Sequence, residues 1–237
     1  MAEHSPLTSA GALGQDTRRI ENLDQYMTNP EAMLHAAFLD RDGVLIADVG
    51  HLTNPRQIQL LPGASQAVKK LNDHQVPVVV VTNQSVIGRG LCSTEELEDI
   101  HFALQDLLAK GGARVNRIYF CPHHPREALG IYKLDCECRK PRPGMLCQAA
   151  QDLGIDLVGS VMVGDNLTDI QAGRSAGCRT VLISDEHGKQ NGRPATEPKH
   201  QPDHIAIGLD SAVDWILENL GASPKQHGPS LQRSIEL

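Results

Sequence analysis

Six short apolar runs constrain the fold of this chain more than any other feature. They are rich in β-branched residues and do not alternate with polar positions, as expected for strands buried on both faces of a parallel sheet. The runs cover residues 35–39, 77–82, 116–120, 160–164, 179–184 and 204–208. Amphipathic stretches that predict helices lie at 63–73, 94–110, 145–153, 167–176 and 211–220. The alternation predicts a three-layer, Rossmann-like α/β fold around a central parallel sheet.

The length of 237 residues suits one such domain, which we place at residues 34–221. Residues 1–33 are polar and irregular, so we expect a flexible arm there, with a functional lid as the alternative. The tail at 222–237 is expected to be disordered. Two segments interrupt the alternation. The segment 121–143 carries cysteines, and 185–203 is interpreted as a surface loop.

Charge and hydropathy exclude several classes of function. The net charge is -7 and the pI is near 5.8, which argues against a basic surface for nucleic acid. No stretch approaches the roughly 18 apolar residues that suggest a membrane span. The first residues lack the pattern of a secretion signal. We therefore expect a cytoplasmic protein with no membrane or nucleic-acid partner, and a monomer.

Three aspartates directly follow predicted strands. Asp40 and Asp42 come after the first apolar run, and Asp165 comes after the fourth. The carboxyl ends of parallel strands converge on one crevice, so these side chains should meet there. A single aspartate after a strand is more often a helix cap or a turn. The pair together with Asp165 instead predicts a magnesium site, in which Gly43 lets the backbone turn sharply after Asp42.

Further polar residues follow the same strands. Thr82, Asn83, Gln84 and Ser85 come after the second run, and their hydroxyl and amide groups can donate hydrogen bonds to an anionic substrate. Asn166, next to Asp165, can do the same. Asp169 has two interpretations of about equal weight: a polar residue in the first turn of the following helix, or a residue of the site.

The segments FLDRDGVL, VVTN and VGDNLTD, together with Lys140, resemble in order the four motifs of the haloacid dehalogenase (HAD) superfamily. The resemblance covers roughly residues 35–220. It implies that Asp40 attacks phosphorus and becomes an aspartyl phosphate, while Asp42 acts as acid and then as base. It also implies that Thr82 bonds a phosphoryl oxygen and that Lys140 neutralises its charge. Aspartate at position 42 favours a phosphatase over a dehalogenase.

A second constellation comprises Cys121, Cys136 and Cys138 with His123 or His124. Three cysteines and one histidine complete a tetrahedral zinc site that leaves no open position, which is typical of structural zinc. Disulfides are the alternative, although clustered cysteines in a cytosolic chain more often bind metal. Spacing alone does not choose between the two histidines.

The segments CPHHP and CECRKPRPGM resemble the D-glycero-D-manno-heptose 1,7-bisphosphate 7-phosphatases. This resemblance implies a compact enzyme without a large cap domain, in which the zinc loop 121–143 shapes the entrance. It also implies that His123 is the zinc ligand. Arg139 would recognise the substrate beside Lys140.

The segment that contains Asp48 and His51 occupies the place of a substrate loop in the same family. His51 departs from the usual tyrosine there, and Asn166 stands where the family commonly has lysine. We carry substrate contacts onto Asp48 and His51 as expectations from the resemblance.

The sequence thus predicts a magnesium- and zinc-containing phosphoric monoester hydrolase. The resemblance implies removal of the 7-phosphate of a heptose 1,7-bisphosphate, a step in making nucleotide-activated heptose for the lipopolysaccharide core. Histidinol phosphate is the alternative substrate. A non-catalytic, zinc-stabilised binding module is the alternative of another class, although a decayed site is expected to lose at least one of these residues.

Overall fold

The computed structural model describes residues 14–15, 34–184 and 201–221. The predicted disordered tail at 222–237 lies outside the described residues. So does the predicted flexible arm at 1–33, apart from Gly14 and Gln15. Most of the predicted surface loop at 185–203 also lies outside them. The proposed domain boundaries stay predictions.

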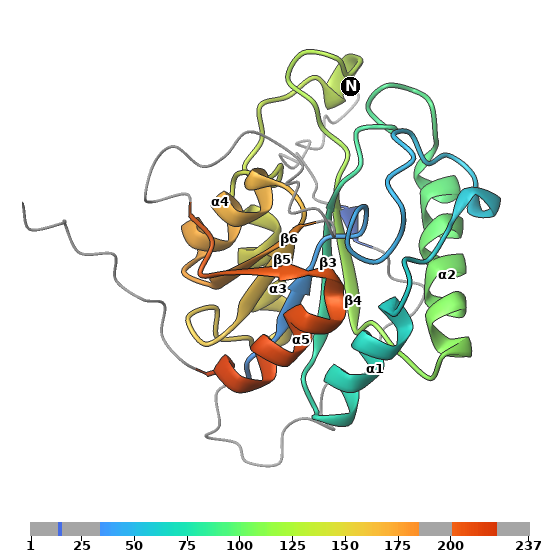
Figure 1. Ribbon diagram of the computed structural model, residues 1–237. Coiled ribbons are helices and arrows are strands. Elements are labelled where there is room, and N and C mark those ends of the chain that lie inside the picture. The colour runs from blue at the N-terminus through green and yellow to red at the C-terminus, as the bar shows by residue number, and fades with distance from the viewer. Residues whose placement is uncertain (1–13, 16–33, 185–200, 222–237) are drawn as a thin grey trace, which may run out of the picture.

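A seven-stranded sheet runs through the molecule in the order β1-β4-β3-β2-β5-β6-β7 (Figure 1). All neighbouring pairs are parallel except β1 and β4, which are antiparallel. The six predicted strands are confirmed. The strands are β1 (Gly14–Gln15), β2 (Ala37–Leu39), β3 (Val78–Asn83), β4 (Arg117–Cys121), β5 (Val161–Gly164), β6 (Arg179–Ser184) and β7 (His204–Ile207).

Five α-helices cover the sheet in the described residues, and the three-layer prediction is confirmed. Helices α1, α2 and α5 pack on one face, while α3 and α4 pack on the other (Figure 1). The helices are α1 (Ala64–Asp73), α2 (Thr94–Lys110), α3 (Gly144–Leu153), α4 (Leu167–Ala176) and α5 (Gly208–Asn219), with short 3-10 turns η2 (Pro55–Gln57) and η3 (Gly130–Tyr132).

Strand β3 illustrates why the apolar runs do not alternate with polar residues. Val78 and Val80 join the core under α1, α2 and α5, whereas Val79 and Val81 join the core under α3 and α4. All four valines are fully buried. Burying each side chain contributes about 1.5–3 kcal/mol, which explains why both faces of this strand are apolar.

The strand order places a switch point next to β2. Strand β3 pairs with one side of β2 and β5 pairs with the other. The connection that leaves β2 leads to β3 on one side, and the connection that leaves β5 leads to β6 on the other, so a crevice opens at the carboxyl ends of β2 and β5. Asp40 follows β2 and Asp165 follows β5, so the topology brings the two predicted residues to this crevice.

Among the strands of the described residues, β1 is the one that the sequence pattern did not predict. Gly14 pairs with Phe120 at the edge of β4. A Cβ atom at Gly14 would lie 2.1 Å from the Phe120 ring, so only glycine fits there. Two residues give too short a run for a periodicity signal, which is why this pairing was missed.

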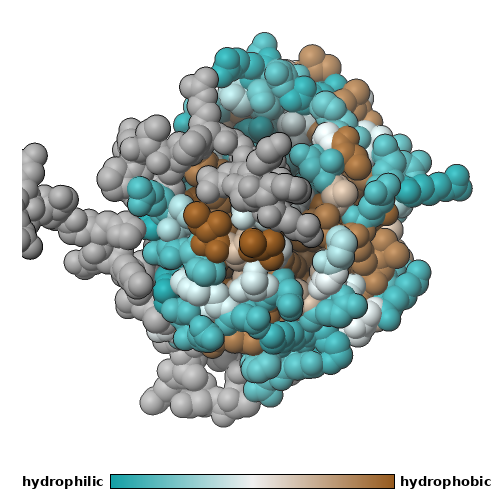
Figure 2. Space-filling model, viewed as in Figure 1, coloured by the Kyte–Doolittle hydropathy of each residue, from teal (hydrophilic) through white to brown (hydrophobic). Residues whose placement is uncertain are grey.

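The surface seen in Figure 2 is largely hydrophilic and carries several separate hydrophobic patches. The most exposed large apolar residues of the described chain include Ile131, Leu129 and Ile207. No helix among the described residues is both long and apolar enough to cross a membrane. The predicted monomeric state stays a prediction.

Candidate active site

The segment after β2 turns sharply, as the sequence predicted. The Asp40 amide donates to the Val163 carbonyl at 2.9 Å, which continues the β2–β5 pairing by one residue. Gly43 then has a φ of 75°, a left-handed conformation that glycine adopts without strain. A Cβ atom at Gly43 would lie 2.2 Å from Asp165 Oδ2. The glycine thus allows the turn and leaves room for the Asp165 carboxylate.

Three carboxylates gather around one lysine at this crevice. One oxygen from each of Asp40, Asp165 and Asp169 lies within 4.8 Å of the others. The Lys140 ammonium lies 2.9 Å from Asp40 Oδ1 and 2.6 Å from Asp169 Oδ1. It also donates to the Val81 carbonyl at 2.9 Å. Hard oxygen ligands in this number suit magnesium.

Burial and neighbouring charges shift the pKa values of the cluster. Burial raises the pKa of Asp40 to about 7, although Lys140 opposes the rise. Burial also raises the pKa of Asp169. For Lys140 burial disfavours the charge, but Asp169 and Asp40 outweigh it and raise the pKa. A divalent cation bound by these carboxylates would oppose the effect of burial and favour their charged forms.

Asp42 points to different partners. Its carboxylate accepts from Arg41 Nε at 3.2 Å and from Arg41 Nη2 at 3.0 and 3.1 Å. Gln84 Nε2 donates to Asp42 Oδ2 at 2.9 Å and also lies 2.9 Å from Thr82 Oγ1. Arg41 is itself buried, and its Nη1 lies 3.3 Å from His101 Nε2. Asp42 is not among the three clustered carboxylates, so its role as a magnesium ligand stays a prediction.

A polar cleft of about 630 Å³ brings the predicted site residues together. Its wall includes the aspartates, the residues after β3, the two residues after Cys138 and the 48–51 segment. The predicted residues in the wall are Asp40, Asp42, Asp48, His51, Thr82, Asn83, Gln84, Ser85, Arg139, Lys140, Asp165 and Asn166. Every predicted catalytic or substrate-binding residue therefore faces one cavity.

Two of these residues have structural bonds as well. The side chain of Asn83 accepts from the Lys140 amide and donates to the Lys140 carbonyl, both at 3.1 Å. Asn166 begins α4 as its N-cap, where its side chain accepts from the Thr168 amide. Asp169 completes the capping box by accepting from the Asn166 amide at 3.1 Å. These bonds fix the positions of Lys140 and Asp169.

The cysteine segment forms a compact cluster after β4. The three sulfur atoms of Cys121, Cys136 and Cys138 lie 3.2–3.5 Å apart. His123 Nδ1 lies 3.7 Å from Cys121 Sγ and 3.3 Å from Cys138 Sγ. The sulfur separations exceed the roughly 2.05 Å of a disulfide bond and match ligands around one centre. His124 instead accepts from the amides of Arg126 and Glu127.

The hydrogen bonds among the three cysteines favour the thiolate form of Cys121. A hydrogen bond from Cys138 lowers the pKa of Cys121 to about 6, against the effect of burial. The same bond, followed by burial, raises the pKa of Cys138. Zinc binds thiolates, so an ion at the centre would let all three cysteines lose their protons. The donor set and its geometry fit zinc.

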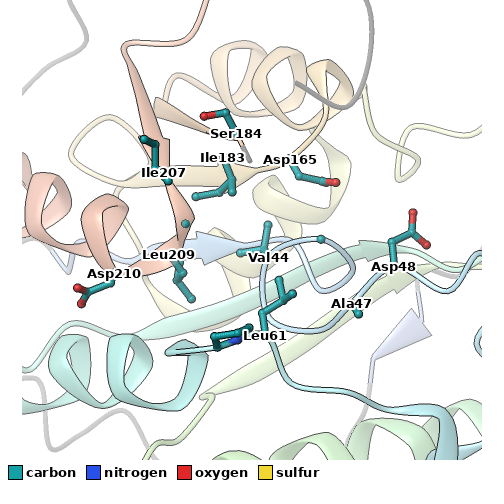
Figure 3. Close-up of a pocket in the computed structure, with 13 residues that line it drawn as sticks. Val44, Ala47, Asp48, Leu61, Asp165, Ile183, Ser184, Ile207, Leu209 and Asp210 are labelled. Atoms are coloured by element: carbon teal, nitrogen blue, oxygen red, sulfur yellow. The ribbon is translucent and has the colours of Figure 1, made fainter. Parts of the chain in front are cut away.

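A second pocket of about 590 Å³ adjoins the polar cleft and shares Asp48 and Asp165 with it. Figure 3 shows Val44, Ile183 and Leu209 around this pocket, with the two shared aspartates to one side and Asp210 to the other. Its wall is mostly apolar, and its charged groups are all acidic.

Sequence reasoning missed or left open three charged residues of this region. The sequence does not decide between a helix-capping role and an active-site role for Asp169, because both need an aspartate at this position. In the structure Asp169 completes the capping box and also belongs to the carboxylate cluster. The role of Arg41 as the partner of Asp42 has no sequence signal of its own, because Arg41 lies between the two aspartates of the motif. Arg89 lines the cleft but follows no strand, so the strand-end rule did not find it.

Two family models match the chain. The haloacid dehalogenase-like hydrolase model matches residues 37–107, and the HAD-hydrolase-like model matches residues 137–212. The first range contains the FLDRDGVL and VVTN segments, and the second contains Lys140 and the VGDNLTD segment.

Two curated relatives point to a narrower family. A D-glycero-D-manno-heptose-1,7-bisphosphate 7-phosphatase from Thermosynechococcus vestitus is 41% identical over 78% of this chain and 96% of its own length. A D-glycero-beta-D-manno-heptose-1,7-bisphosphate 7-phosphatase from Yersinia pestis is 37% identical over 80% and 93%.

A solved structure agrees with these relatives. The D,D-heptose 1,7-bisphosphate phosphatase from B. bronchiseptica, complexed with magnesium and phosphate, has a TM-score of 0.66 and 34% identity, covering 78% of this chain and 99% of its own. Fold, site geometry and these similarities lead to one conclusion: the chain belongs to the heptose 1,7-bisphosphate 7-phosphatase family of HAD hydrolases.

Proposed function

We propose that this protein removes the 7-phosphate of D-glycero-D-manno-heptose 1,7-bisphosphate through an aspartyl phosphate on Asp40, and so serves the making of nucleotide-activated heptose for the lipopolysaccharide core. The observation that carries the proposal is the polar cleft, in which Asp40, Asp42, Thr82, Lys140 and Asp165 face one another. A carboxylate nucleophile divides hydrolysis into two easier steps.

Asp40 has the geometry of a nucleophile. Its Oδ1 accepts from Lys140 Nζ and from the Arg41 amide at 2.7 Å. Both bonds hold the same oxygen, so the attack on phosphorus falls to Oδ2. The two hydrogen bonds keep the orientation of the carboxylate fixed, while its place in the cleft wall leaves it open to a substrate.

Asp42 would donate a proton to the leaving sugar oxygen and later accept one from water. Asp42 Oδ2 accepts hydrogen bonds from both Arg41 and Gln84. Of these donors, only Arg41 Nη2 also donates to Asp42 Oδ1. Oδ1 is therefore the oxygen that handles the proton. Thr82 Oγ1, at the end of β3, would bond a phosphoryl oxygen.

Lys140 and Arg139 supply positive charge to the cleft. Lys140 is buried between Asp40 and Asp169 and would offset the charge that gathers at phosphorus. Arg139 Nη1 donates to the His123 carbonyl at 3.1 Å, so its backbone and its guanidinium are both tied to the zinc loop. We propose that Arg139 contacts the substrate, together with Asp48, His51, Ser85 and Asn166.

We propose magnesium as the cofactor of the cleft, held by Asp40 and Asp165 with Asp169 beside them. When bound, magnesium would neutralise phosphate and carboxylate charge. Asp42 stays a proposed further ligand. We propose a structural zinc at Cys121, His123, Cys136 and Cys138, which would fix the loop that delivers Arg139 and Lys140.

The substrate assignment rests on the relatives named above. Histidinol phosphate is a poorer candidate, because those relatives are heptose bisphosphate phosphatases. A non-catalytic binding module is disfavoured, because all of the residues needed for aspartyl-phosphate chemistry line the cleft. We also propose residues 34–221 as the phosphatase domain, acting as a cytoplasmic monomer on a small phosphorylated sugar.

A phosphate-release screen tests the proposal. Purified protein is assayed with heptose 1,7-bisphosphate, sugar monophosphates and histidinol phosphate, with and without added magnesium. We expect the highest kcat/KM for the bisphosphate and loss of turnover after magnesium removal. Preference for histidinol phosphate would overturn the substrate but not the phosphatase. Full activity without magnesium would overturn the role of the carboxylate cluster.

A further inference from the structure

Arg41 contacts both aspartates of the proposed reaction, although it is not among the described residues that line the polar cleft. Its amide donates to Asp40 Oδ1 at 2.7 Å, and its guanidinium donates to both oxygens of Asp42. Its backbone carbonyl accepts from the amides of Leu45 and Ile46 at 2.9 and 3.1 Å, so the backbone is fixed on both sides. The direction of Asp42 therefore depends on where the long side chain of Arg41 is held.

The Arg41 side chain is buried, and a buried charge needs partners. Its exposed fraction is 1%, so the guanidinium has exchanged water for protein groups. Nε and Nη2 both donate to Asp42. Nη1 instead lies 3.3 Å from Nε2 of His101, which follows 60 residues later on α2. The other end of the guanidinium is thus held by a residue of the helical layer.

His101 is itself held in place by the core. It is fully buried, and its ring is tilted against the ring of Phe120 on β4, with the ring centroids 5.6 Å apart. Ile100 and Leu104, its neighbours on α2, are also fully buried and belong to the core on this face of the sheet. Close packing restricts the rotamers of buried side chains, so the imidazole gives Arg41 a rigid partner.

One arrangement of protons makes the contact between Arg41 and His101 a hydrogen bond. A guanidinium has donors and no acceptor, so His101 Nε2 has to be the acceptor. The imidazole must then be neutral, with its proton on Nδ1. A side chain that offers an oxygen at the same place could replace it, whereas an apolar side chain would remove this partner of a buried donor. The contact therefore has a chemical requirement that packing alone does not have.

Gln84 supports Asp42 from a different element, the end of β3. Its Nε2 donates to Asp42 Oδ2 and to Thr82 Oγ1, both at 2.9 Å. Asp42 Oδ1, to which we assign the proton transfer, accepts instead from Arg41 Nη2 at 3.1 Å. A shift of the Arg41 side chain would therefore displace the oxygen that handles the proton and would affect catalysis more than substrate binding.

We propose that His101 is a positioning residue of the reaction: it accepts a hydrogen bond from Arg41 Nη1 and thereby holds the guanidinium that orients Asp42 for proton transfer. His101 is not among the described residues that line the polar cleft, so it acts through Arg41 and not on the substrate. The proposal rests on the proposed function, because the orientation of Asp42 matters only where a leaving group needs its proton.

Two substitutions of His101 separate the hydrogen bond from packing. His101→Gln keeps an acceptor near the position of Nε2 and removes the ring, whereas His101→Phe keeps a ring against Phe120 and removes the acceptor. We expect kcat for a sugar phosphate to fall roughly threefold to tenfold in His101→Phe and to stay within about twofold in His101→Gln, with KM changed less than about twofold in both. If thermal unfolding shows that His101→Phe does not fold, His101→Met, which matches glutamine in length, takes its place. A packing role predicts the reverse order, and that order would overturn the proposal.

The leaving group provides a second readout. The loss of kcat in His101→Phe should be smaller with p-nitrophenyl phosphate than with the sugar phosphate, because the nitrophenolate needs little help from an acid. His74→Phe is the matched control, because His74 is exposed at the end of α1, and it should change kcat less than about twofold on either substrate. Equal losses on both substrates in His101→Phe would overturn the proposal.

A double variant tests whether His101 acts through Arg41. Arg41→Gln should lower kcat for the sugar phosphate about tenfold, and the addition of His101→Phe should lower it no further, because the hydrogen bond between them is already lost. Independent effects would instead multiply to a loss of roughly thirtyfold to a hundredfold, and that result would overturn the proposal.

The proposed function fails on different results. If the wild-type protein releases no phosphate from sugar phosphates, or if Asp42→Asn retains full turnover, the proposed function itself is wrong. If Asp42→Asn loses turnover while His101→Phe retains all of it, the phosphatase stands and only the role of His101 is overturned.

Discussion

The thiol–imidazole cluster and the carboxylate cluster both lie at the carboxyl edge of the sheet, yet they are built in opposite ways. Cys121, His123, Cys136 and Cys138 face one another and supply the four ligands that zinc takes in a closed site. Asp40, Asp165 and Asp169 supply fewer ligands than magnesium needs, and they face the polar cleft. The thiol–imidazole cluster can therefore fix a loop, whereas the carboxylate cluster leaves coordination positions that a substrate can occupy.

Lys140 connects the two clusters. It follows Cys138 by two residues and inserts between Asp40 and Asp169. The carboxylate cluster thus receives its cation from the loop that the thiol cluster organises. The comparison teaches that the thiol–imidazole cluster can position a cation of the carboxylate cluster without itself lining the polar cleft.

The largest expected effect comes from the open cluster. Asp40→Asn should lower kcat by roughly 10³-fold or more, because the amide is a poor nucleophile. The fold should persist, since the change removes a buried charge and keeps the shape of the side chain. Steady-state kinetics and thermal unfolding check this. Substantial residual turnover would remove Asp40 as the nucleophile.

The closed cluster should respond differently. Cys138→Ser should lose its zinc and lower kcat/KM by roughly 10–100-fold, because Arg139 and Lys140 lose their support. Metal analysis should find about one zinc per wild-type chain and close to none in the variant. Cys147→Ser, which lies outside the cluster, is the control and should retain both zinc and activity. A wild-type protein that folds fully without zinc would contradict the assignment.

A smaller effect is expected at Arg41, which holds Asp42 beside the open cluster. Arg41→Gln should lower kcat about tenfold for a sugar phosphate, whose alkoxide leaving group needs a proton. It should lower kcat less for p-nitrophenyl phosphate, whose leaving group needs little help. The exposed Arg56→Gln is the control. Equal losses on both substrates would mean that Arg41 does not act through Asp42.

The smallest effect concerns stability against pH in magnesium-free protein. The pKa of Asp40 rises from an ordinary 3.8 to about 7 on folding, so the folded state binds the proton more tightly. Stability from this group is therefore present at low pH and is lost as pH rises from about 4 to 7. Asp40→Asn should flatten this decline in chemical unfolding curves measured at pH 5 and pH 8. An equal decline in both proteins would exclude Asp40 as its source.

Much of this fold could be predicted from the sequence, because buried parallel strands leave an apolar pattern. The runs at 77–82 and 179–184 became β3 and β6 almost residue for residue. The cleft could also be predicted in outline, because the strand-end rule places Asp40, Thr82 and Asp165 together.

The rest depends on contacts that leave no periodic signal. Gly14 joins the sheet only because Phe120 leaves space for a residue without a side chain. Arg89 reaches the cleft from a turn held by Ser85. The orientation of Asp42 toward Arg41 is a choice of side-chain rotamer, and neighbouring sequence does not determine it.

The bonds between Asn83 and the backbone of Lys140 have a consequence for the order of assembly. Asp40 precedes Lys140 by 100 residues and Asp165 follows it, so the fold must bring three distant segments together. Without Lys140 in place, the three clustered acids would lack their cation and repel one another. If zinc closes the loop, a cell short of zinc would make complete chains that stay inactive. The fraction of active enzyme would then depend on the zinc concentration in the cell, although zinc takes no part in the reaction.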